Sequence, residues 1–257
     1  MIQLINLKKA FGPKVITNGV NLEVGDGELL AIIGRSGEGK SVLLKQIIGL
    51  IKPDAGQIII DQEDISQLEG KKLQAVFKKC GYVFQFAALL DSLTVFENVG
   101  ITLLEEGAQP ETIRSLIVEK LKNVGLHEDV MDKYPDELSG GMKKRVGLAR
   151  TLMLTPKVLI YDEPTTGLDP ITTRLIHELI KKTHTEYNAT TLVISHDVEV
   201  FKYASHVAML HEGKIVYKGK ANEIWESDNP YVYQFIRGLT QGPIEQLGFV
   251  KNAHDVV

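Results

Sequence analysis

A glycine-rich segment limits the possible folds of this chain more than any other feature. It reads GRSGEGKS over residues 34–41 and directly follows the apolar run Leu29–Ile33. The apolar run predicts a buried strand, and the periodicity of residues 42–50 predicts a helix. Strand, glycine loop and helix in this order form a phosphate-binding P-loop, because glycines let successive backbone N–H groups point at phosphate oxygens. The sequence therefore predicts a site for a nucleoside triphosphate.

Two side chains of this loop are expected to act on the triphosphate. Lys40 should reach the β- and γ-phosphates, the hydroxyl of Ser41 should bind Mg²⁺, and the helix adds its positive dipole end. Polyphosphate repels a carboxylate, so we expect the side chain of Glu38 to point outward. A glycine-rich turn without a ligand is the alternative, but every position of the loop fits the motif. The expected nucleotide contacts are Gly34, Arg35, Ser36, Gly37, Glu38, Gly39, Lys40 and Ser41.

A second apolar run, residues 158–161, ends in the carboxylates Asp162 and Glu163. Acidic side chains at the carboxyl end of a buried parallel strand lie where open sheets bind their ligands. We expect Asp162 to hold Mg²⁺ through water and Glu163 to polarise the attacking water as general base. An ordinary pair of acids at a strand end is the alternative, and the preceding P-loop favours the catalytic interpretation.

One histidine stands out from the others. His196 follows a third predicted strand, residues 191–195, which should lie beside the strand that ends at Glu163. From that position its side chain would contact the γ-phosphate and the attacking water. A single histidine is more often structural, and that interpretation applies to the remaining six, which are His127, His177, His184, His206, His211 and His254.

A third motif, LSGGM over residues 138–142, opens a long predicted helix that runs to residue 154. The N–H groups at the start of a helix form an anion-binding end. ATP is a polyanion, so a second helix N-terminus that faces it from the opposite side would stabilise it. A helix N-cap with a flexible turn is the alternative interpretation.

Together these motifs resemble those of ABC-type ATPases over residues 1–240. Gln85 resembles the Q-loop glutamine, which senses Mg²⁺ and the transport partner, and Asp169 lies in a D-loop-like GLD motif. Phe11 lies where the family stacks an aromatic ring on adenine. The resemblance implies ATP and Mg²⁺ as cofactors, bound between two copies in a head-to-tail dimer. It implies Lys40, Gln85, Glu163 and His196 as catalytic residues, Ser41, Gln85 and Asp162 as metal ligands, and further nucleotide contacts from Phe11, Ser139, Gly140, Gly141 and Asp169.

The expected fold is α/β, a P-loop NTPase core with a mainly parallel sheet and helices on both faces. Residues 1–30 and 57–61 predict an antiparallel β-subdomain, and residues 86–155 an α-helical subdomain that carries the signature. We expect an ATPase domain over residues 1–238 and a C-terminal extension over residues 239–257. The extension either contacts the neighbouring subunit or is a frayed terminus.

Three further segments are similar to the ATPase subunits of MCE-domain (Mla-type) lipid transporters. They are the Met-Lys-Lys-Arg stretch over residues 142–145, the region 81–95, and the tail 234–238 with Gly242-Pro243. The resemblance implies phospholipid as cargo, a permease dimer in the bacterial inner membrane, and an MCE-domain substrate-binding protein. It is also compatible with a small accessory protein as a further partner. Residues 143–145 could instead form a solvated helix face.

The same resemblance implies that a coupling helix of the permease docks near residues 85–93. Residues 87–90 fit an apolar groove for such a helix. The alternative is that these residues pack inside the helical subdomain.

Composition excludes several other functions. The net charge of −4 argues against a nucleic acid partner, and the single cysteine, Cys80, excludes an internal disulfide and suits a reducing cytosol. We see neither a signal peptide nor an apolar stretch of the ~20 residues that span a bilayer. The chain is therefore expected at the cytoplasmic face of the membrane, acting through a permease.

Two alternative functions stay open at this stage. One is the ATPase of a polar-solute importer, such as an amino-acid importer, and the other is a soluble scaffold that does not transport. DNA-repair heads are excluded because the stretch between Lys40 and Ser139 shows no sustained heptads.

Overall fold

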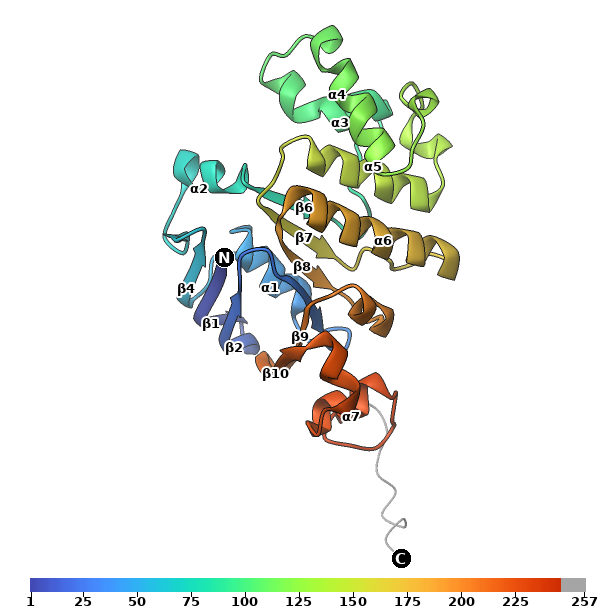
Figure 1. Cartoon of the computed structure of the whole chain (residues 1–257). Helices are drawn as coiled ribbons and strands as arrows, with labels where there is room; N and C mark the ends of the chain where they lie inside the picture. The colour runs from blue at the N-terminus through green and yellow to red at the C-terminus, as the bar shows by residue number, and fades with distance from the viewer. Residues whose placement is uncertain (246–257) are drawn as a thin grey trace, which may run out of the picture.

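The computed structural model describes residues 1–245 of the 257-residue chain and forms two sheets there (Figure 1). The larger sheet has the strand order β10-β9-β3-β8-β7-β6, and the smaller one has the order β2-β1-β4-β5. The strands are β1 (Ile2–Phe11), β2 (Lys14–Val24), β3 (Leu29–Ile33), β4 (Ala55–Ile60), β5 (Glu63–Asp64), β6 (Cys80–Val83), β7 (Val158–Asp162), β8 (Thr190–Ile194), β9 (His206–His211) and β10 (Lys214–Lys220). The α-helices are α1 (Lys40–Ile47), α2 (Gly70–Phe77), α3 (Val95–Glu105), α4 (Pro110–Asn123), α5 (Gly140–Leu152), α6 (Pro170–Tyr187) and α7 (Pro230–Ile236).

The larger sheet is mainly parallel, as the sequence predicts. Strand β3 pairs in parallel with β8 and β9, and β7 pairs in parallel with β6 and β8; only β10 runs antiparallel, in a hairpin with β9. Every residue of β3, β7 and β8 is buried. Continuous burial explains why these strands read as uninterrupted apolar runs, since both faces of the sheet are covered.

The smaller sheet is the predicted antiparallel β-subdomain. Strand β1 lies between β2 and β4 and pairs antiparallel with each of them. Its inner face, with Ile2, Leu4 and Leu7, packs into one hydrophobic cluster with Leu43 and Leu44 of α1. This contact fixes the β-subdomain against the helix that follows the P-loop.

Helices α3, α4 and α5 lie together at the end of the molecule opposite α7 (Figure 1). A capping box formed by Thr94 and Glu97 begins α3, and Pro110 begins α4. The buried face of α4 contains Ile113, Ile117, Lys120 and Leu121, and Lys120 is only 5 % exposed. Its ammonium group donates hydrogen bonds to Tyr187 and Glu119, which satisfies the charge in a buried position.

Two expectations from composition can be compared with the described residues. Cys80 is free and buried, and burial raises the pKa of its thiol to about 12. Among residues 1–245, no helix is both long enough and apolar enough to cross a membrane. The limits of the ATPase domain and of its helical part stay predictions, and residues 246–257 of the expected extension lie outside the described part.

Candidate active site

The parallel strands bring the three predicted loops to one edge of the sheet. Residues 34–41 follow β3, Asp162 and Glu163 end β7, and His196 follows β8. These loops border a cleft of about 530 Å³. It is lined by Lys14, Ile16, Ser36, Gly37, Gly39, Lys40, Ser41, Val42, Gln85, Glu163, Thr166 and His196. All four predicted catalytic residues therefore meet in one cleft.

The backbone of the glycine loop requires glycine at two points. Gly39 has φ +93° and precedes the first residue of α1, and a Cβ there would lie 2.6 Å from Cγ2 of Ile16. At Gly34 a Cβ would lie 2.4 Å from the carbonyl oxygen of Leu210. The loop can follow this path only because side chains are absent at both positions.

Lys40 is buried under its own loop. Its Nζ donates to the carbonyl oxygens of Gly34 at 2.7 Å and Arg35 at 2.9 Å, and it lies 3.7 Å from Oε1 of Glu163. Burial lowers the pKa of Lys40, and the nearby carboxylates of Glu163, Glu38 and Asp162 oppose this shift. The ammonium group thus lies in the cleft where anionic oxygens would bind it more strongly than carbonyl oxygens do.

Asp162, the last residue of β7, connects the P-loop helix α1 with the neighbouring strand β6. Ser41 Oγ donates to Asp162 Oδ1 at 3.1 Å, and the hydroxyl of Tyr82 donates to Oδ2 at 2.8 Å. Gln85 lines the same cleft. Carboxylate, hydroxyl and amide oxygens are the hard ligands that Mg²⁺ prefers, so the donor set fits this ion. Tyr82 is not among the site residues predicted from the sequence.

Glu163 has a left-handed backbone, with φ +50°, which is uncommon for a residue with a side chain. Its Oε2 contacts Nδ1 of His196 and accepts a hydrogen bond from Thr166 Oγ1 at 3.0 Å. Its side chain is 14 % exposed, while that of His196 is 57 % exposed. Strained backbones of this kind occur at functional sites, where they fix the direction of a side chain.

Lys144 links the signature helix to the loop that carries Glu163. It lies on α5, and its Nζ donates to the carbonyl oxygens of Pro164 at 2.7 Å and Thr166 at 2.8 Å. Burial lowers the pKa of Lys144, although Glu163 opposes the shift. The interpretation of residues 143–145 as a solvated face is therefore wrong for Lys144, which is 9 % exposed.

The signature and D-loop residues lie near one another but outside this cleft. Ser139 caps α5 by accepting from the N–H of Met142, and Asp169 caps α6 by accepting from the N–H groups of Ile171 and Thr172. A Cβ at Gly141 would lie 2.7 Å from Cγ2 of Thr172, so the two helix starts are in contact. Within the described chain, the cleft lining does not include Ser139, Gly140, Gly141 or Asp169.

Four of the expected P-loop and adenine contacts do not line the cleft, namely Gly34, Arg35, Glu38 and Phe11. The carboxylate of Glu38 accepts from the N–H of Glu212 at 2.6 Å and contacts Nδ1 of His211 at 3.1 Å. It points away from the cleft, but at 14 % exposure it does not face solvent as expected. The guanidinium of Arg35 donates to the carbonyl oxygen of Glu245. Phe11 is 49 % exposed and does not line the cleft, whereas Lys14 and Ile16 do.

The segment after Gln85 is partly buried against the helical subdomain and partly exposed. Ala87 is buried against α5, while Phe86 is 83 % exposed and Leu90 is 47 % exposed. The guanidinium of Arg150 donates to the carbonyl oxygens of Ala88 at 2.7 Å and Ala87 at 2.8 Å. Helix α5 therefore holds the backbone of this segment, while the side chains of Phe86 and Leu90 stay exposed.

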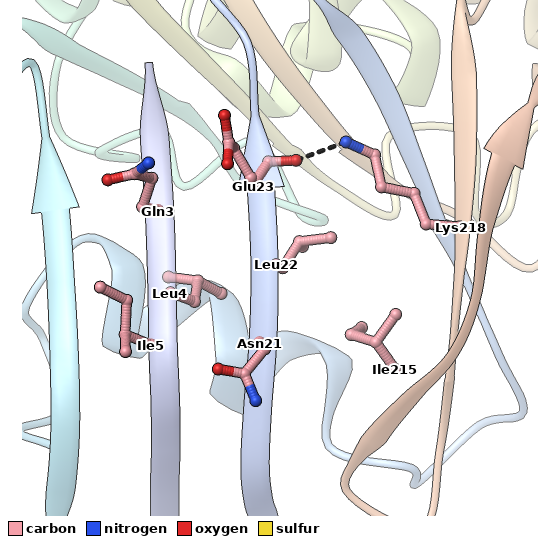
Figure 2. A pocket seen from close by; sticks show the side chains of 8 residues that line it. All are labelled: Gln3, Leu4, Ile5, Asn21, Leu22, Glu23, Ile215 and Lys218. Atoms are coloured by element: carbon pink, nitrogen blue, oxygen red, sulfur yellow. Dashed lines mark hydrogen bonds between the residues drawn. The ribbon is translucent and has the colours of Figure 1, made fainter.

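A second, shallower groove of about 330 Å³ lies between β1, β2 and β10 (Figure 2). Lys218 spans it and donates to the carbonyl oxygen of Glu23. None of the predicted site residues lines this groove. The chemistry of the molecule is therefore assigned to the P-loop cleft.

Comparison with known proteins agrees with this geometry. Residues 17–166 match the sequence model of the family described as ABC transporter. This chain belongs to the ABC transporter family. It is 38 % identical over 246 residues to the intermembrane phospholipid transport system ATP-binding protein MlaF of Haemophilus influenzae, covering 95 % of this chain and 93 % of that protein. It is 39 % identical over 245 residues to the probable ribonucleotide transport ATP-binding protein mkl of Mycobacterium leprae, covering 95 % and 70 %.

Solved structures support the same assignment. The ABC ATPase superposes with a TM-score of 0.77 on the dimeric, post-hydrolysis structure of the ATP-binding cassette MJ0796 bound to ADP and Pi. The two chains are 34 % identical, and the match covers 86 % of this chain and 99 % of that one. The chain is thus the ATP-hydrolysing subunit of a transporter, and the similarity supports a dimer. The roles of the individual site residues stay predictions.

Proposed function

We propose that this ABC ATPase powers phospholipid transport between the inner and outer membranes of a bacterium. It would work as a head-to-tail pair on a permease dimer, at the cytoplasmic face of the inner membrane, with an MCE-domain protein as the lipid-binding partner. The observation that carries the proposal is the alignment with the intermembrane phospholipid transport protein over 93 % of that protein's length. The Met-Lys-Lys-Arg stretch over residues 142–145 agrees with this assignment.

The cleft supports a direct role for the chain's own side chains in hydrolysis. Lys40 would exchange its two carbonyl partners for oxygens of the β- and γ-phosphates. Glu163, aimed into the cleft by its left-handed backbone, would accept the proton of the attacking water. His196 lies against Glu163 and would contact the γ-phosphate.

Mg²⁺ would be held by Ser41, Asp162 and Gln85. The ion would neutralise charge that develops on the phosphate oxygens. The oxygen chemistry of these three side chains supports the assignment, because Mg²⁺ prefers hard oxygen ligands.

The positions outside the cleft support the proposed pairing of two copies. Ser139, Gly140, Gly141 and Asp169 cannot line the cleft of their own chain in this arrangement. In a head-to-tail dimer the N-terminus of α5 would face the nucleotide of the other copy. The free N–H groups there are suited to an anion.

The surface beside Gln85 supports contact with a permease. Phe84, Phe86 and Leu90 are 38 %, 83 % and 47 % exposed, which is unusual for three large apolar side chains in one short segment. Such a patch suits the apolar face of a partner helix. Arg150 would keep the patch connected to the signature helix through the backbone of residues 87–88.

A polar-solute importer is the second candidate, because the mycobacterial relative is named for ribonucleotide transport. Affinity purification of the tagged protein from detergent-solubilised membranes separates the two. The phospholipid proposal predicts a permease and an MCE-domain protein as companions, with phospholipid in the complex. A periplasmic solute-binding protein would support the importer instead, and no membrane companion at all would support a soluble scaffold.

A further inference from the structure

The strand β6 places a tyrosine hydroxyl on the carboxylate that would hold the metal. Tyr82 pairs with Ile160 of β7, and the next residue on that face of β7 is Asp162. The hydroxyl of Tyr82 donates to Asp162 Oδ2 at 2.8 Å. The contact therefore follows from the strand register and not from a flexible loop.

Both oxygens of the Asp162 carboxylate are held, and by different elements. Ser41 Oγ at the start of α1 donates to Oδ1 at 3.1 Å, while Tyr82 holds Oδ2. Asp162 is only 7 % exposed, so water is a poor substitute for either donor. The hydroxyl of Ser41 can donate its proton to Oδ1 while a lone pair of its oxygen faces the metal. The hydrogen bond from Tyr82 to Oδ2 would then prevent rotation of the carboxylate.

The surroundings keep Tyr82 in this orientation. Its ring packs against that of Phe84, with centroids 4.5 Å apart. A tyrosine that only fills space would not need a bond to a buried carboxylate that lies between Ser41 and Glu163 of the cleft.

We propose that Tyr82 is a positioning residue that orients Asp162 toward the Mg²⁺ bound with the nucleotide. The inference rests on the proposed role of Asp162 and Ser41 as metal-binding groups. Groups that orient metal-binding side chains typically contribute about 10-fold to 100-fold in metal affinity. Removal of the hydroxyl alone should therefore weaken Mg²⁺ binding and leave the binding of metal-free nucleotide intact.

The test uses the full chain and a fluorescent, non-hydrolysable ATP analogue. Binding is measured in EDTA and over a Mg²⁺ titration, and bound Mn²⁺ is measured by electron paramagnetic resonance. The variant is Tyr82→Phe, which keeps the ring on Phe84. The matched control is Tyr161→Phe, because the hydroxyl of Tyr161 lies on the neighbouring strand but bonds to Thr183 Oγ1 at 2.9 Å.

In Tyr82→Phe, the Mg²⁺ concentration needed for half-maximal binding of the analogue should be about tenfold higher than in the wild type. The spectrum of bound Mn²⁺ should change, and the affinity for the analogue in EDTA should be unaltered. Tyr161→Phe should keep the Mg²⁺ requirement of the wild type. The inference is overturned if Tyr82→Phe keeps it too, or if its affinity falls equally with and without metal. If nucleotide binding by the wild type does not depend on Mg²⁺ at all, the proposed metal site itself is wrong, and so is the role of Tyr82.

Discussion

Nζ of Lys144, on the signature helix, donates a hydrogen bond at 2.7 Å to the carbonyl oxygen of Pro164, the residue that follows Glu163. A second bond from the same ammonium group reaches the carbonyl oxygen of Thr166 at 2.8 Å. Thr166 in turn donates to the carboxylate of Glu163. A movement of the signature helix would thus be transmitted to the loop of the proposed general base within one chain.

Replacing this ammonium group should destabilise the fold as well as the site. Lys144→Met keeps the length of the side chain but leaves two buried carbonyl groups without their donor. We expect the free energy of unfolding to fall by about 2–3 kcal/mol, since hydrogen bonds from charged groups contribute this much. Urea unfolding measures the change, with Lys143→Met as the control. Equal stability of the two variants would show that the bonds of Lys144 contribute nothing.

Removal of the proposed general base should separate binding from hydrolysis. Glu163→Gln keeps the shape of the side chain but cannot accept the proton of water. We expect ATP binding to persist, turnover to fall by about 10²–10⁴, and a closed dimer to accumulate with ATP. Turnover assays and size-exclusion chromatography with Mg²⁺ and ATP measure the two effects. Full hydrolysis in this variant would reject the role of Glu163.

The start of α3 should make stability depend on acid pH. Hydrogen bonds from the backbone and side chain of Thr94 hold the pKa of Glu97 below its ordinary value of 4.5. A lowered folded-state pKa means that the stabilisation is present above the unfolded pKa and is lost as the pH falls through the folded pKa. Compared with Glu97→Gln, the wild type should therefore be more stable by about 0.3–1 kcal/mol at pH 7, with no difference near pH 2. Urea unfolding at both pH values checks this, and a difference that survives acid would contradict it.

The C-terminal segment should contribute to the pairing of two copies. Gln234 Oε1 accepts from the N–H of Ile244 at 2.7 Å, and Arg35 of the P-loop donates to the carbonyl oxygen of Glu245. Truncation after Gly238 removes these contacts together with the rest of the extension. We expect the truncated Glu163→Gln variant to form dimers more weakly than full-length Glu163→Gln in the presence of ATP. Analytical ultracentrifugation measures the difference. Unchanged assembly of the truncated Glu163→Gln variant, together with unchanged ATPase activity of the truncated wild type, would show that the extension is incidental.

The sequence predicted the elements and most of the cleft, because both have local signals. The buried strands are continuous apolar runs, and the glycine loop lies between such a strand and a helix. Tyr82, Lys144 and Thr166 had no such signal, since their importance arises only when β6, α5 and the loop after β7 meet in space. The burial of Lys120 had no such signal either, because its partner Tyr187 lies at the end of a distant helix.

The central claim is that each nucleotide is bound by the P-loop of one copy and the signature of the other. A structure of the Glu163→Gln dimer with Mg²⁺ and ATP tests it most directly. The account predicts that Ser139 and the N–H of Gly141 of one copy lie within hydrogen-bond distance of the γ-phosphate that contacts Lys40 of the other. A dimer in which Ser139 is remote from the opposing γ-phosphate would contradict it.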